Sequence, residues 1–370
     1  MYKIAHLTSV HQRYDARIFF KECLSLANNG YVVNLIVADG KGSETKDRIS
    51  ILDVGASTGR MDRILNSSGR VYKKALELDA DLYHFHDPEL IPVGLKLKKL
   101  GYRVVFDIHE NTDMQILIKE WIPFYIRRLA SRIYNIFEVF ACRKFDALIV
   151  PQVSMQKKFC QFSRCELVAN FPNGLIGSCE RKRHNKHNLF YAGGLSKARG
   201  LHNMLDLIVA LNELDSEYRL KLAGPISKVD MIDMQAHKGW HSVDYLGVLN
   251  KDQVYSEYRK NSIGLILFNN AGQYHMSYAL KLFEYMQCGM TVIMPNFGEW
   301  TEFNKKFRVG YNVDVTSPAQ TAVLIFSLNE ERLASFANHN HAVSKLHFLW
   351  ATQEKTLLSL YGELLNDKKV

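Results

Sequence analysis

The chain is poor in cysteine and proline and has no long hydrophobic run. Its six cysteines are scattered without a CxxC pair, which disfavours zinc ribbons and disulfide scaffolds and favours free thiols. No apolar stretch approaches the roughly 20 residues of a membrane-spanning helix. Residues 1–7 are typical of a first strand and lack the apolar core and cleavage site of a signal peptide. We therefore expect a cytoplasmic protein.

The composition is that of a globular protein with an anionic partner. The chain has 370 residues, of which 47% are hydrophobic and 23% charged, enough for two ordinary domains. The formal net charge is +9. Such an excess indicates nucleic acid, a membrane surface or a diphosphate substrate as partner.

Strand-like and helical stretches alternate along the chain, and the pattern restarts after Asn188. Such alternation predicts an α/β protein with two Rossmann-like, doubly wound parallel sheets. We predict an N-terminal domain at 1–172, a polar linker at 173–187, a C-terminal domain at 188–347 and a terminal amphipathic helix at 348–370. Ligands of such domains bind at the carboxyl ends of the strands, so functional residues should lie in the loops that follow strands.

The segment 278–292 is the most informative. Leu282, Tyr285 and Met286 share one face of a predicted helix over 278–288, and a buried strand follows Gly289. Lys281 and the free N–H groups of the first turn suit an anion, and Glu284 can accept both hydroxyls of a ribose. These features favour a nucleoside diphosphate. The alternative is a core-facing helix with a solvated glutamate.

A second cationic loop follows the predicted strand at 189–195. Gly193 and Gly194 allow the backbone to approach a ligand, and Lys197 and Arg199 add positive charge. The loop fits neither G-x-G-x-x-G nor the P-loop spacing, which disfavours NAD and ATP. The alternative is a solvated turn.

Histidines and acids follow strands in the first half. His84 and His86 point to one side of a strand, and with Asp87 or His109 they could bind zinc. Such pairs often only form hydrogen bonds, so we assign no metal ligand. Asp15 could simply cap a helix. The D-x-D sequence at residues 79–81 precedes a strand, away from the functional edge.

The segment 119–158 is basic and aromatic. It suits either an anionic lipid surface or a core-facing helix with a wet basic side. Nucleic acid is disfavoured, because no binding motif is present and the basic residues are dispersed.

Several phrases together resemble a known family. HLTSVHQRYDARIF, HFHDPEL, FDIHE, YAGG…RG and KLFEYMQCG are similar to the retaining GT-B glycosyltransferases of group 1, family 4, in the subgroup that builds bacterial surface polysaccharides such as the O-antigen of lipopolysaccharide. The resemblance implies two facing Rossmann-like domains, with a C-terminal helix that crosses back to the first. It also implies transfer of a sugar, with retention, from a nucleotide-sugar donor, a UDP-sugar in preference to a GDP-sugar. No cofactor or metal is implied.

The resemblance also assigns site residues. Glu284 matches the second of two glutamates, while Met276 stands where the family has the first, with His275 beside it. Arg199 takes the place of the family's phosphate-binding lysine, and Gly194 that of its arginine. The implied catalytic residues are His109, Arg199 and Glu284. The implied donor-binding residues are Gly193, Gly194, Lys197, Gly224, Tyr245, Gly247, Ala279, Leu280, Lys281, Leu282 and Glu284. The implied acceptor-side residues are His11, Arg13, Asp15, His86, Asp87 and Glu110.

The resemblance finally implies a lipid-diphosphate-linked glycan as acceptor and a peripheral position on the inner face of the cytoplasmic membrane. Two other functions remain open. One is a sugar-nucleotide epimerase of the same fold. The other is a catalytically silent subunit that binds nucleotide or lipid, which the loss of the glutamate at Met276 would suit.

Overall fold

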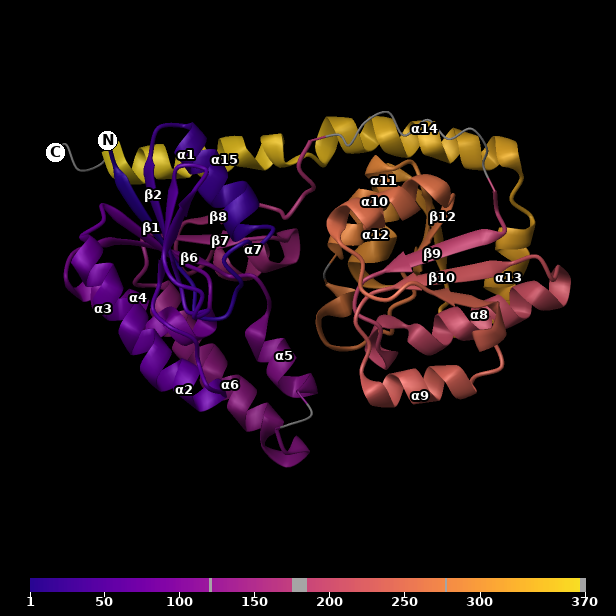
Figure 1. Ribbon diagram of the computed structural model, residues 1–370, viewed down its shortest axis with the longest axis horizontal. Helices are drawn as coiled ribbons and strands as arrows, with labels where there is room; N and C mark the ends of the chain where they lie inside the picture. The colour runs from indigo at the N-terminus through magenta and orange to yellow at the C-terminus, as the bar shows by residue number, and fades with distance from the viewer. Residues whose placement is uncertain (120–121, 175–184, 277, 367–370) are drawn as a thin grey trace. The chain divides into compact units, whose positions relative to one another are not determined.

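The computed structural model describes residues 1–119, 122–174, 185–276 and 278–366. The chain forms two compact units, Met1–Asn173 with Trp350–Val370, and Gly174–Leu349. Each contains a parallel sheet between helices (Figure 1). Of the predicted linker at 173–187, residues 175–184 lie outside the described part.

The N-terminal domain has an eight-stranded sheet of order β3-β4-β2-β1-β5-β6-β7-β8. All neighbouring strands are parallel except β3 and β4. The strands are β1 Lys3–Leu7, β2 Val32–Val37, β3 Glu44–Lys46, β4 Ile49–Asp53, β5 Leu82–Phe85, β6 Arg103–Asp107, β7 Ala147–Val150 and β8 Cys165–Leu167. The sequence did not predict β3 and β8, which are three-residue edge strands.

Helices cover both faces of this sheet. The helical elements are η1 Ile18–Cys23, α1 Leu24–Asn28, α2 Arg60–Asp62, η2 Arg63–Ser67, α3 Ser68–Leu78, η3 Pro88–Leu90, α4 Ile91–Lys99, α5 Thr112–Ile118, α6 Phe124–Cys142, α7 Val153–Phe159 and α15 Trp350–Asn366. Because side chains alternate along a strand, β1 sends Ile4 into a core with η1, α1 and α15, and Ala5 into a second core with α3, α4 and α6.

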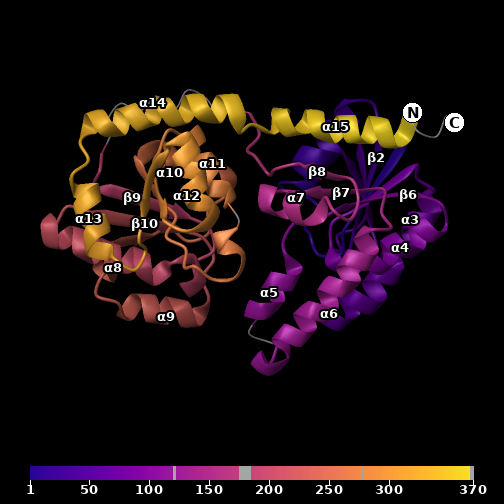
Figure 2. The ribbon, with the colours of Figure 1, turned by 180° about the vertical axis from the view of Figure 1, so that it is seen from behind.

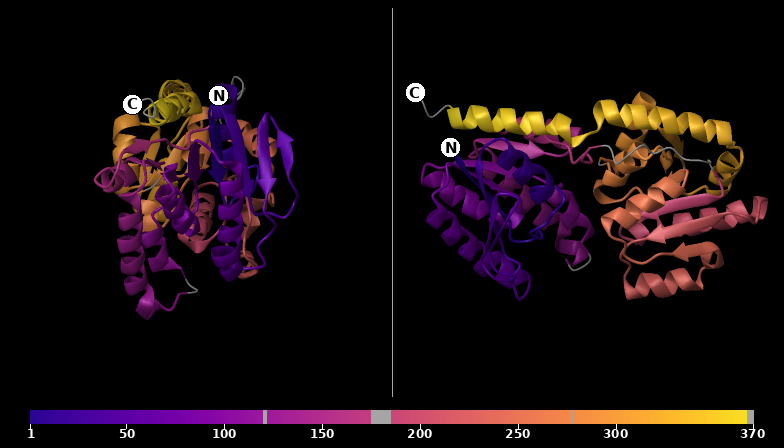
Figure 3. Two further views of the ribbon diagram at one scale, coloured as in Figure 1. Left: turned by 90° about the vertical axis from the view of Figure 1, so that its left-hand side faces the viewer. Right: turned by 45° about the horizontal axis from the view of Figure 1, so that its top comes forward.

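The last helix, α15, completes the N-terminal domain (Figure 3). Its apolar stripe enters the core beneath β1 and β2, and Trp350 Nε1 donates a hydrogen bond to Ser25 Oγ at 2.9 Å. The predicted return of a C-terminal helix to the first domain is confirmed. The residues of α15 buried there are Trp350, Leu357, Leu360, Tyr361, Leu364 and Leu365.

The C-terminal domain has a six-stranded, wholly parallel sheet of order β11-β10-β9-β12-β13-β14. Its strands are β9 Asn188–Ala192, β10 Arg219–Ala223, β11 Val243–Tyr245, β12 Ile263–Leu265, β13 Thr291–Pro295 and β14 Gly310–Val313. Its helical elements are η4 Lys197–Arg199, α8 Leu201–Leu214, α9 Lys228–Ala236, η5 Trp240–Ser242, α10 Lys251–Lys260, η6 Gly272–His275, α11 Leu280–Gln287, α12 Gly298–Phe307, α13 Pro318–Phe326 and α14 Glu330–His347. Figure 2 shows its strands β9 and β10 with helix α8 beside them. The predicted α/β class with two parallel sheets is confirmed.

The helix that carries Glu284 is held tightly against the sheet. A Cβ atom added to Gly264 in β12 would lie 2.5 Å from the Tyr285 ring, so a glycine there lets α11 approach the strand.

The five described cysteines form no disulfide with one another. None of the helices in the described ranges is long and apolar enough to cross a membrane.

Candidate functional site

In each sheet the first strand of the domain lies in the middle, and later strands are added on both sides of it. In the C-terminal domain β9 lies between β10 and β12, and in the N-terminal domain β1 lies between β2 and β5. Ligands of open α/β sheets bind beside the carboxyl ends of strands where the strand order reverses in this way. The loops after β9 and β12, and those after β1 and β5, are therefore the places to examine.

Three loops of the C-terminal domain are joined by hydrogen bonds at this edge. Gly193 N donates to Ala223 O, and Gly224 N donates to Gly247 O, both at 2.8 Å. The hydroxyl of Tyr245 donates to Gly224 O at 2.9 Å. Gly224 has φ +136°, and an added Cβ would lie 2.0 Å from Gly193 O. These contacts thus hold together four of the predicted donor-binding residues, which are Gly193, Gly224, Tyr245 and Gly247.

Arg199 is positioned by the short helix η4. Ser196 caps this helix by accepting from Arg199 N, and Arg199 Nε donates to Tyr274 Oη at 3.3 Å. A Cβ on Gly194 would lie 2.9 Å from the Arg199 guanidinium, so the predicted glycine makes room for the predicted arginine. Lys197 is exposed, and no partner of its ammonium is recorded in the described part of the domain.

Lys281 is buried beside this loop without a hydrogen-bond partner. Its Nζ lies 3.4 Å from the centre of the Tyr191 ring and 5.2 Å from that of Phe268. No group in the described ranges forms a hydrogen bond with it. Burial lowers the pKa of Lys281 well below its usual value, Arg199 lowers it further, and Glu284 opposes the shift.

The glycine loop packs directly on this ammonium. A Cβ on Gly193 would lie 2.8 Å from Lys281 Nζ. The helix α11 begins at Leu280 with Ala279 as its N-cap, two residues later than predicted. Lys281 turns toward the Tyr191 ring, whereas the sequence had placed it facing an anion at the helix opening. Leu282 is buried in the core, so only its backbone could contact a ligand.

Glu284 lies one turn into α11, next to two tyrosines of α10. Tyr255 Oη donates to one carboxylate oxygen at 3.3 Å and Tyr258 Oη to the other at 2.9 Å. These bonds orient the carboxylate.

The segment before α11 contains the residues at the family's first glutamate. Met276 follows the short helix η6, which ends at His275. The carbonyl of His275 packs against Gly298, whose added Cβ would lie 1.9 Å from it. This contact fixes the backbone of the segment.

In the N-terminal domain, Asp87 organises the loop after β1. Its Oδ2 accepts from Thr8 Oγ1 at 2.8 Å, from Ser9 N at 2.5 Å and from Val10 N at 3.2 Å. His11 then lies between two acids, with Nε2 3.4 Å from Asp87 and Nδ1 3.4 Å from Asp15. Burial lowers the pKa of His11, but Asp15 and Asp87 more than compensate, so that the pKa is raised.

His109 joins the same group from the loop after β6. Its ring centre lies 4.9 Å from that of His11, and its Nε2 is 2.9 Å from Asp107 Oδ2. The Nδ1 atom of His86 lies 3.2 Å from the same oxygen. The structure therefore brings four predicted residues together: His11, His86, Asp87 and His109.

Sequence reasoning missed the centre of this group, which is the ion pair of Arg17 with Asp107. The guanidinium forms two hydrogen bonds with the carboxylate, at 2.8 and 2.9 Å. Burial raises the pKa of Asp107, but Arg17 and His109 lower it well below its usual value. Both residues stood in phrases that carried the resemblance, which was the available signal.

Three further acceptor-side predictions fall outside that centre. Arg13 is buried in an ion pair with Asp39 and Glu44, and Glu110 accepts a hydrogen bond from Gln115. Asp15 accepts from the backbone N–H groups that open η1, as a cap does, besides contacting His11.

The helix α6 exposes most of its apolar side chains. Its buried residues are only Glu138, Ala141 and Cys142. Arg143 and Lys144 line a hollow of about 460 Å³ along α6. The exposed face of this helix is therefore basic as well as apolar. Its exposed large apolar residues are Phe124, Tyr125, Ile126, Leu129, Ile133, Ile136, Phe137 and Phe140. Trp121, which the sequence analysis placed in this segment, lies outside the described residues.

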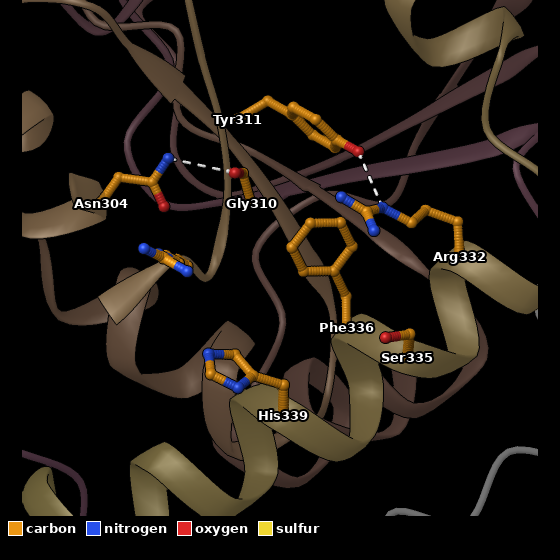
Figure 4. A pocket seen from close by; sticks show the side chains of 8 residues that line it. Asn304, Gly310, Tyr311, Arg332, Ser335, Phe336 and His339 are labelled. Carbon is orange, nitrogen blue, oxygen red and sulfur yellow. Dashed lines mark hydrogen bonds between the residues drawn. The ribbon is translucent and has the colours of Figure 1, made fainter. Parts of the chain in front are cut away.

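A separate hollow of about 500 Å³ lies near the start of β14 (Figure 4). Arg332 Nε donates there to Tyr311 Oη at 3.2 Å. Its lining includes none of the predicted site residues. The lining residues are Asn304, Arg308, Gly310, Tyr311, Arg332, Ser335, Phe336 and His339.

Two protein-family models match the chain. Residues 17–175 match the model of Glycosyltransferase Family 4, and residues 179–345 match that of Glycosyl transferases group 1. The chain belongs to the group 1 GT-B glycosyltransferases. The first match spans most of the acidic and histidine-rich group, and the second spans Arg199, Lys281 and Glu284.

Solved structures of this glycosyltransferase fold are similar over nearly the whole chain. Sucrose-phosphate synthase from Thermosynechococcus elongatus gives a TM-score of 0.79 at 13% identity, over 99% of this chain and 100% of that one. A UDP-forming α,α-trehalose-phosphate synthase from Burkholderia vietnamiensis gives 0.72 at 10%, over 100% and 99%. An E. coli structure described as trehalose-6-phosphate bound with UDP-2-fluoro glucose gives 0.72 at 12%, over 98% and 99%. At these identities the likeness concerns the fold. No curated protein sequence matches the chain.

Proposed function

We propose that this glycosyltransferase moves a sugar from a nucleoside-diphosphate donor, a UDP-sugar in preference to a GDP-sugar, to a hydroxyl of a lipid-linked glycan, with retention of configuration. The observation that carries the proposal is the ammonium of Lys281, which is buried without a hydrogen-bond partner in the described ranges beside Arg199 and the Gly193 loop.

A diphosphate supplies negative charge and hydrogen-bond acceptors to Lys281 and Arg199. Two neighbouring positive groups repel each other, and a buried charge without a partner is costly. A bound diphosphate offsets both costs and accepts hydrogen bonds from Lys281 and Arg199. Those bonds strengthen as negative charge develops on the leaving group, so they accelerate cleavage of the donor's glycosidic bond without a metal.

Glu284 supplies the ribose contact. Tyr255 and Tyr258 hold its carboxylate in one orientation, and the carboxylate oxygens accept hydrogen bonds from the two ribose hydroxyls. Met276 stands at the family's first glutamate, so the donor sugar is held by other groups, and the adjacent His275 can contribute.

The acceptor binds the N-terminal domain beside His11 and His109. His109 contacts the acceptor or the donor sugar, while Asp107 orients its ring. The acceptor hydroxyl attacks from the side of the leaving group and passes its proton to the departing phosphate. The exposed apolar and basic face of α6 supports a peripheral position on anionic lipid at the cytoplasmic face of the membrane, where a lipid-diphosphate glycan is found.

The test is donor binding followed by transfer. Thermal stabilisation is measured with UDP-, GDP- and dTDP-sugars, because a ligand of the folded form raises the melting temperature. We expect a UDP-sugar to stabilise the protein, and Glu284→Ala to remove most of that shift. The matched control is Glu299→Ala, because Glu299 also accepts from a tyrosine, Tyr278. Absence of stabilisation by every nucleotide sugar would contradict the proposal.

Product analysis separates this function from its alternatives. Transfer to lipid-linked glycan, with the anomeric configuration read by NMR and without added Mg²⁺ or Mn²⁺, supports the proposal. Conversion of a nucleotide sugar without acceptor indicates an epimerase, and binding without transfer or hydrolysis indicates a silent subunit. Transfer only to a sugar phosphate would refute the lipid-linked acceptor and keep the donor site.

A further inference from the structure

Three histidines and a glutamate form a closed cluster inside the N-terminal domain. They are His6 of β1, His84 of β5, His86 directly after β5, and Glu22 of η1, and all four are buried. Each places a possible metal-ligand atom within 4.8 Å of those of the other three. The sequence analysis had combined His84 and His86 with Asp87 or His109, and had not considered His6 or Glu22.

Strand register explains why these residues meet. His6 and His84 are direct partners in the parallel pairing of β1 with β5, and their ring centres lie 4.6 Å apart. His86 follows His84 by two residues and therefore points to the same face of the sheet. That face is covered by η1, which carries Glu22, and by α15.

The polar atoms of the cluster are incompletely satisfied by protein groups. Within the described ranges, Nε2 of His84 and both carboxylate oxygens of Glu22 are buried without a hydrogen-bond partner. Arg17 Nε lies 3.0 Å from Glu22 Oε1, but the same guanidinium already binds Asp107. Two buried carboxylates thus face one buried cation, and buried polar atoms without partners are costly.

The opposite ring nitrogens of the histidines are engaged in the way metal ligands are. His86 Nδ1 lies 3.2 Å from Asp107, and Tyr361 Oη lies 2.7 Å from His84 Nδ1 and 3.4 Å from His6 Nε2. Histidines that bind a metal donate their other N–H to a carboxylate or another oxygen, which fixes the tautomer. The tyrosine oxygen has two lone pairs and can accept from both rings.

We propose that His6, His84, His86 and Glu22 bind a structural divalent cation, with zinc as the metal that fits. Three imidazole nitrogens and one carboxylate oxygen make a closed four-ligand set that suits tetrahedral Zn²⁺. His6 Nδ1 lies 3.0 Å from His86 Nε2 and 4.0 Å from a Glu22 oxygen. Zinc–ligand bonds of about 2.0–2.2 Å span such gaps after small side-chain shifts. The ion ties β1, β5, η1 and, through Tyr361, α15 into one core. Its site shares His86 with the proposed acceptor side but contains none of the proposed donor-binding residues.

The experiment measures the metal directly. The full-length protein, purified without a metal-affinity tag, is analysed for metal content by mass spectrometry and then stripped with a chelator. We expect about one zinc per chain, a lower melting temperature after stripping, and recovery with Zn²⁺ alone. Co²⁺ added to the stripped protein should give the visible absorption of a tetrahedral site.

Variants separate this cluster from adventitious binding. Glu22→Gln and His84→Gln should each lose the bound zinc, and Tyr361→Phe should weaken it about 10–100-fold, as loss of a supporting hydrogen bond does. His187→Gln is the matched control, because His187, Asp215 and Glu217 form a second group of possible ligands that is only partly buried.

The outcomes are distinguishable even when one variant does not fold, because Glu22→Gln and Tyr361→Phe preserve side-chain size. Metal-free protein whose melting temperature does not respond to Zn²⁺ would overturn the proposal. Zinc retained by folded Glu22→Gln but lost from His187→Gln would overturn it as well. Neither result would affect nucleotide-sugar binding.

Discussion

The ammonium nitrogen of Lys281 lies 3.4 Å from the centre of the Tyr191 ring. The ring face offers a partial negative charge to the cation, but it supplies no hydrogen-bond acceptor. Arg199 also repels this ammonium. The charged form of Lys281 is therefore disfavoured in the ligand-free C-terminal domain, and binding of an anion favours it.

Replacing Lys281 separates stability from binding. Lys281→Met keeps an unbranched side chain that is one atom shorter and removes the buried amino group, which has no hydrogen-bond partner among the described residues, so the free energy of unfolding should rise by about 1–3 kcal/mol. Nucleotide-sugar affinity should fall at least about tenfold, because a charge-assisted bond to phosphate is lost. Urea unfolding and calorimetric titration measure the two effects. Lys305→Met is the control, since Lys305 of α12 is exposed and is not a predicted site residue, and an equal loss of affinity there would argue against a special role for Lys281.

Arg199 should act on turnover. Arg199→Ala is expected to lower kcat by about 10²-fold, as loss of a group that stabilises developing charge does. Arg332 offers a close control, because its Nε also donates to a tyrosine hydroxyl, at 3.2 Å, and it lies in the other hollow. Steady-state assays should show Arg332→Ala close to the unmodified enzyme. An Arg199→Ala enzyme with unchanged kcat would remove this residue from the mechanism.

Donor binding should be accompanied by proton uptake at pH values between the ligand-free and the ligand-bound pKa of Lys281. Burial and Arg199 lower the pKa of Lys281 in the ligand-free protein, and a bound diphosphate favours the charged form and raises this pKa. Affinity should therefore fall as pH rises from the ligand-free pKa toward the ligand-bound pKa. Calorimetry in buffers of different ionisation enthalpy measures the uptake. Lys281→Met should show none, and identical uptake in that variant would assign the proton to another group.

Glu138 of α6 should make stability depend on pH. Burial raises the pKa of its carboxyl to about 7, although Lys158 and Tyr134 oppose the shift and Asp113 adds to it. The folded form thus holds this proton more tightly than the unfolded chain, and the free energy of unfolding should decrease as pH rises from about 4.5 to 7. The total change is on the order of 3 kcal/mol, because each pKa unit corresponds to about 1.4 kcal/mol. Glu138→Gln should flatten this part of the profile, and an unaltered slope would refute the assignment.

Membrane attachment through α6 has a matched test. Ile136 of α6 and Ile232 of α9 are both 69% exposed, so their replacement by glutamate changes the surface equally. Ile136→Glu should reduce sedimentation with vesicles that contain phosphatidylglycerol, whereas Ile232→Glu should not. Binding that resists Ile136→Glu, or that is equally strong on neutral vesicles, would contradict attachment through this basic and apolar face.

The sequence predicted the parts of the fold that depend on local pattern. The alternation of strands and helices predicted the two α/β domains. The apolar stripe of the last helix predicted the face of α15 that is buried, which includes Tyr361. The exposed strand β3 was missed because its three residues bury nothing. The local pattern predicted the end of α11 to within one residue but placed its start two residues too early. The start was misplaced because the turn around Ala279 has no side-chain cap that the sequence could reveal.

The parts that were missed depend on contacts between distant residues. The Arg17–Asp107 pair joins positions 90 residues apart, and the meeting of His6 with His84 depends on how β1 and β5 are aligned. Neither follows from periodicity. The ammonium of Lys281 in α11 lies over the Tyr191 ring of strand β9, so the sequence could place the residue near the loop but could not show this contact.

The position of α15 determines the order in which the polypeptide matures on the ribosome. The first 173 residues emerge early, yet the core beneath β1 and β2 lacks Leu357, Leu360 and Leu365 until the second unit and then α15 have been synthesised. The half translated first is thus the half completed last, with apolar surface open to chaperones in the meantime. A nascent chain released before residue 350 would hold a finished second half joined to an unfinished first half.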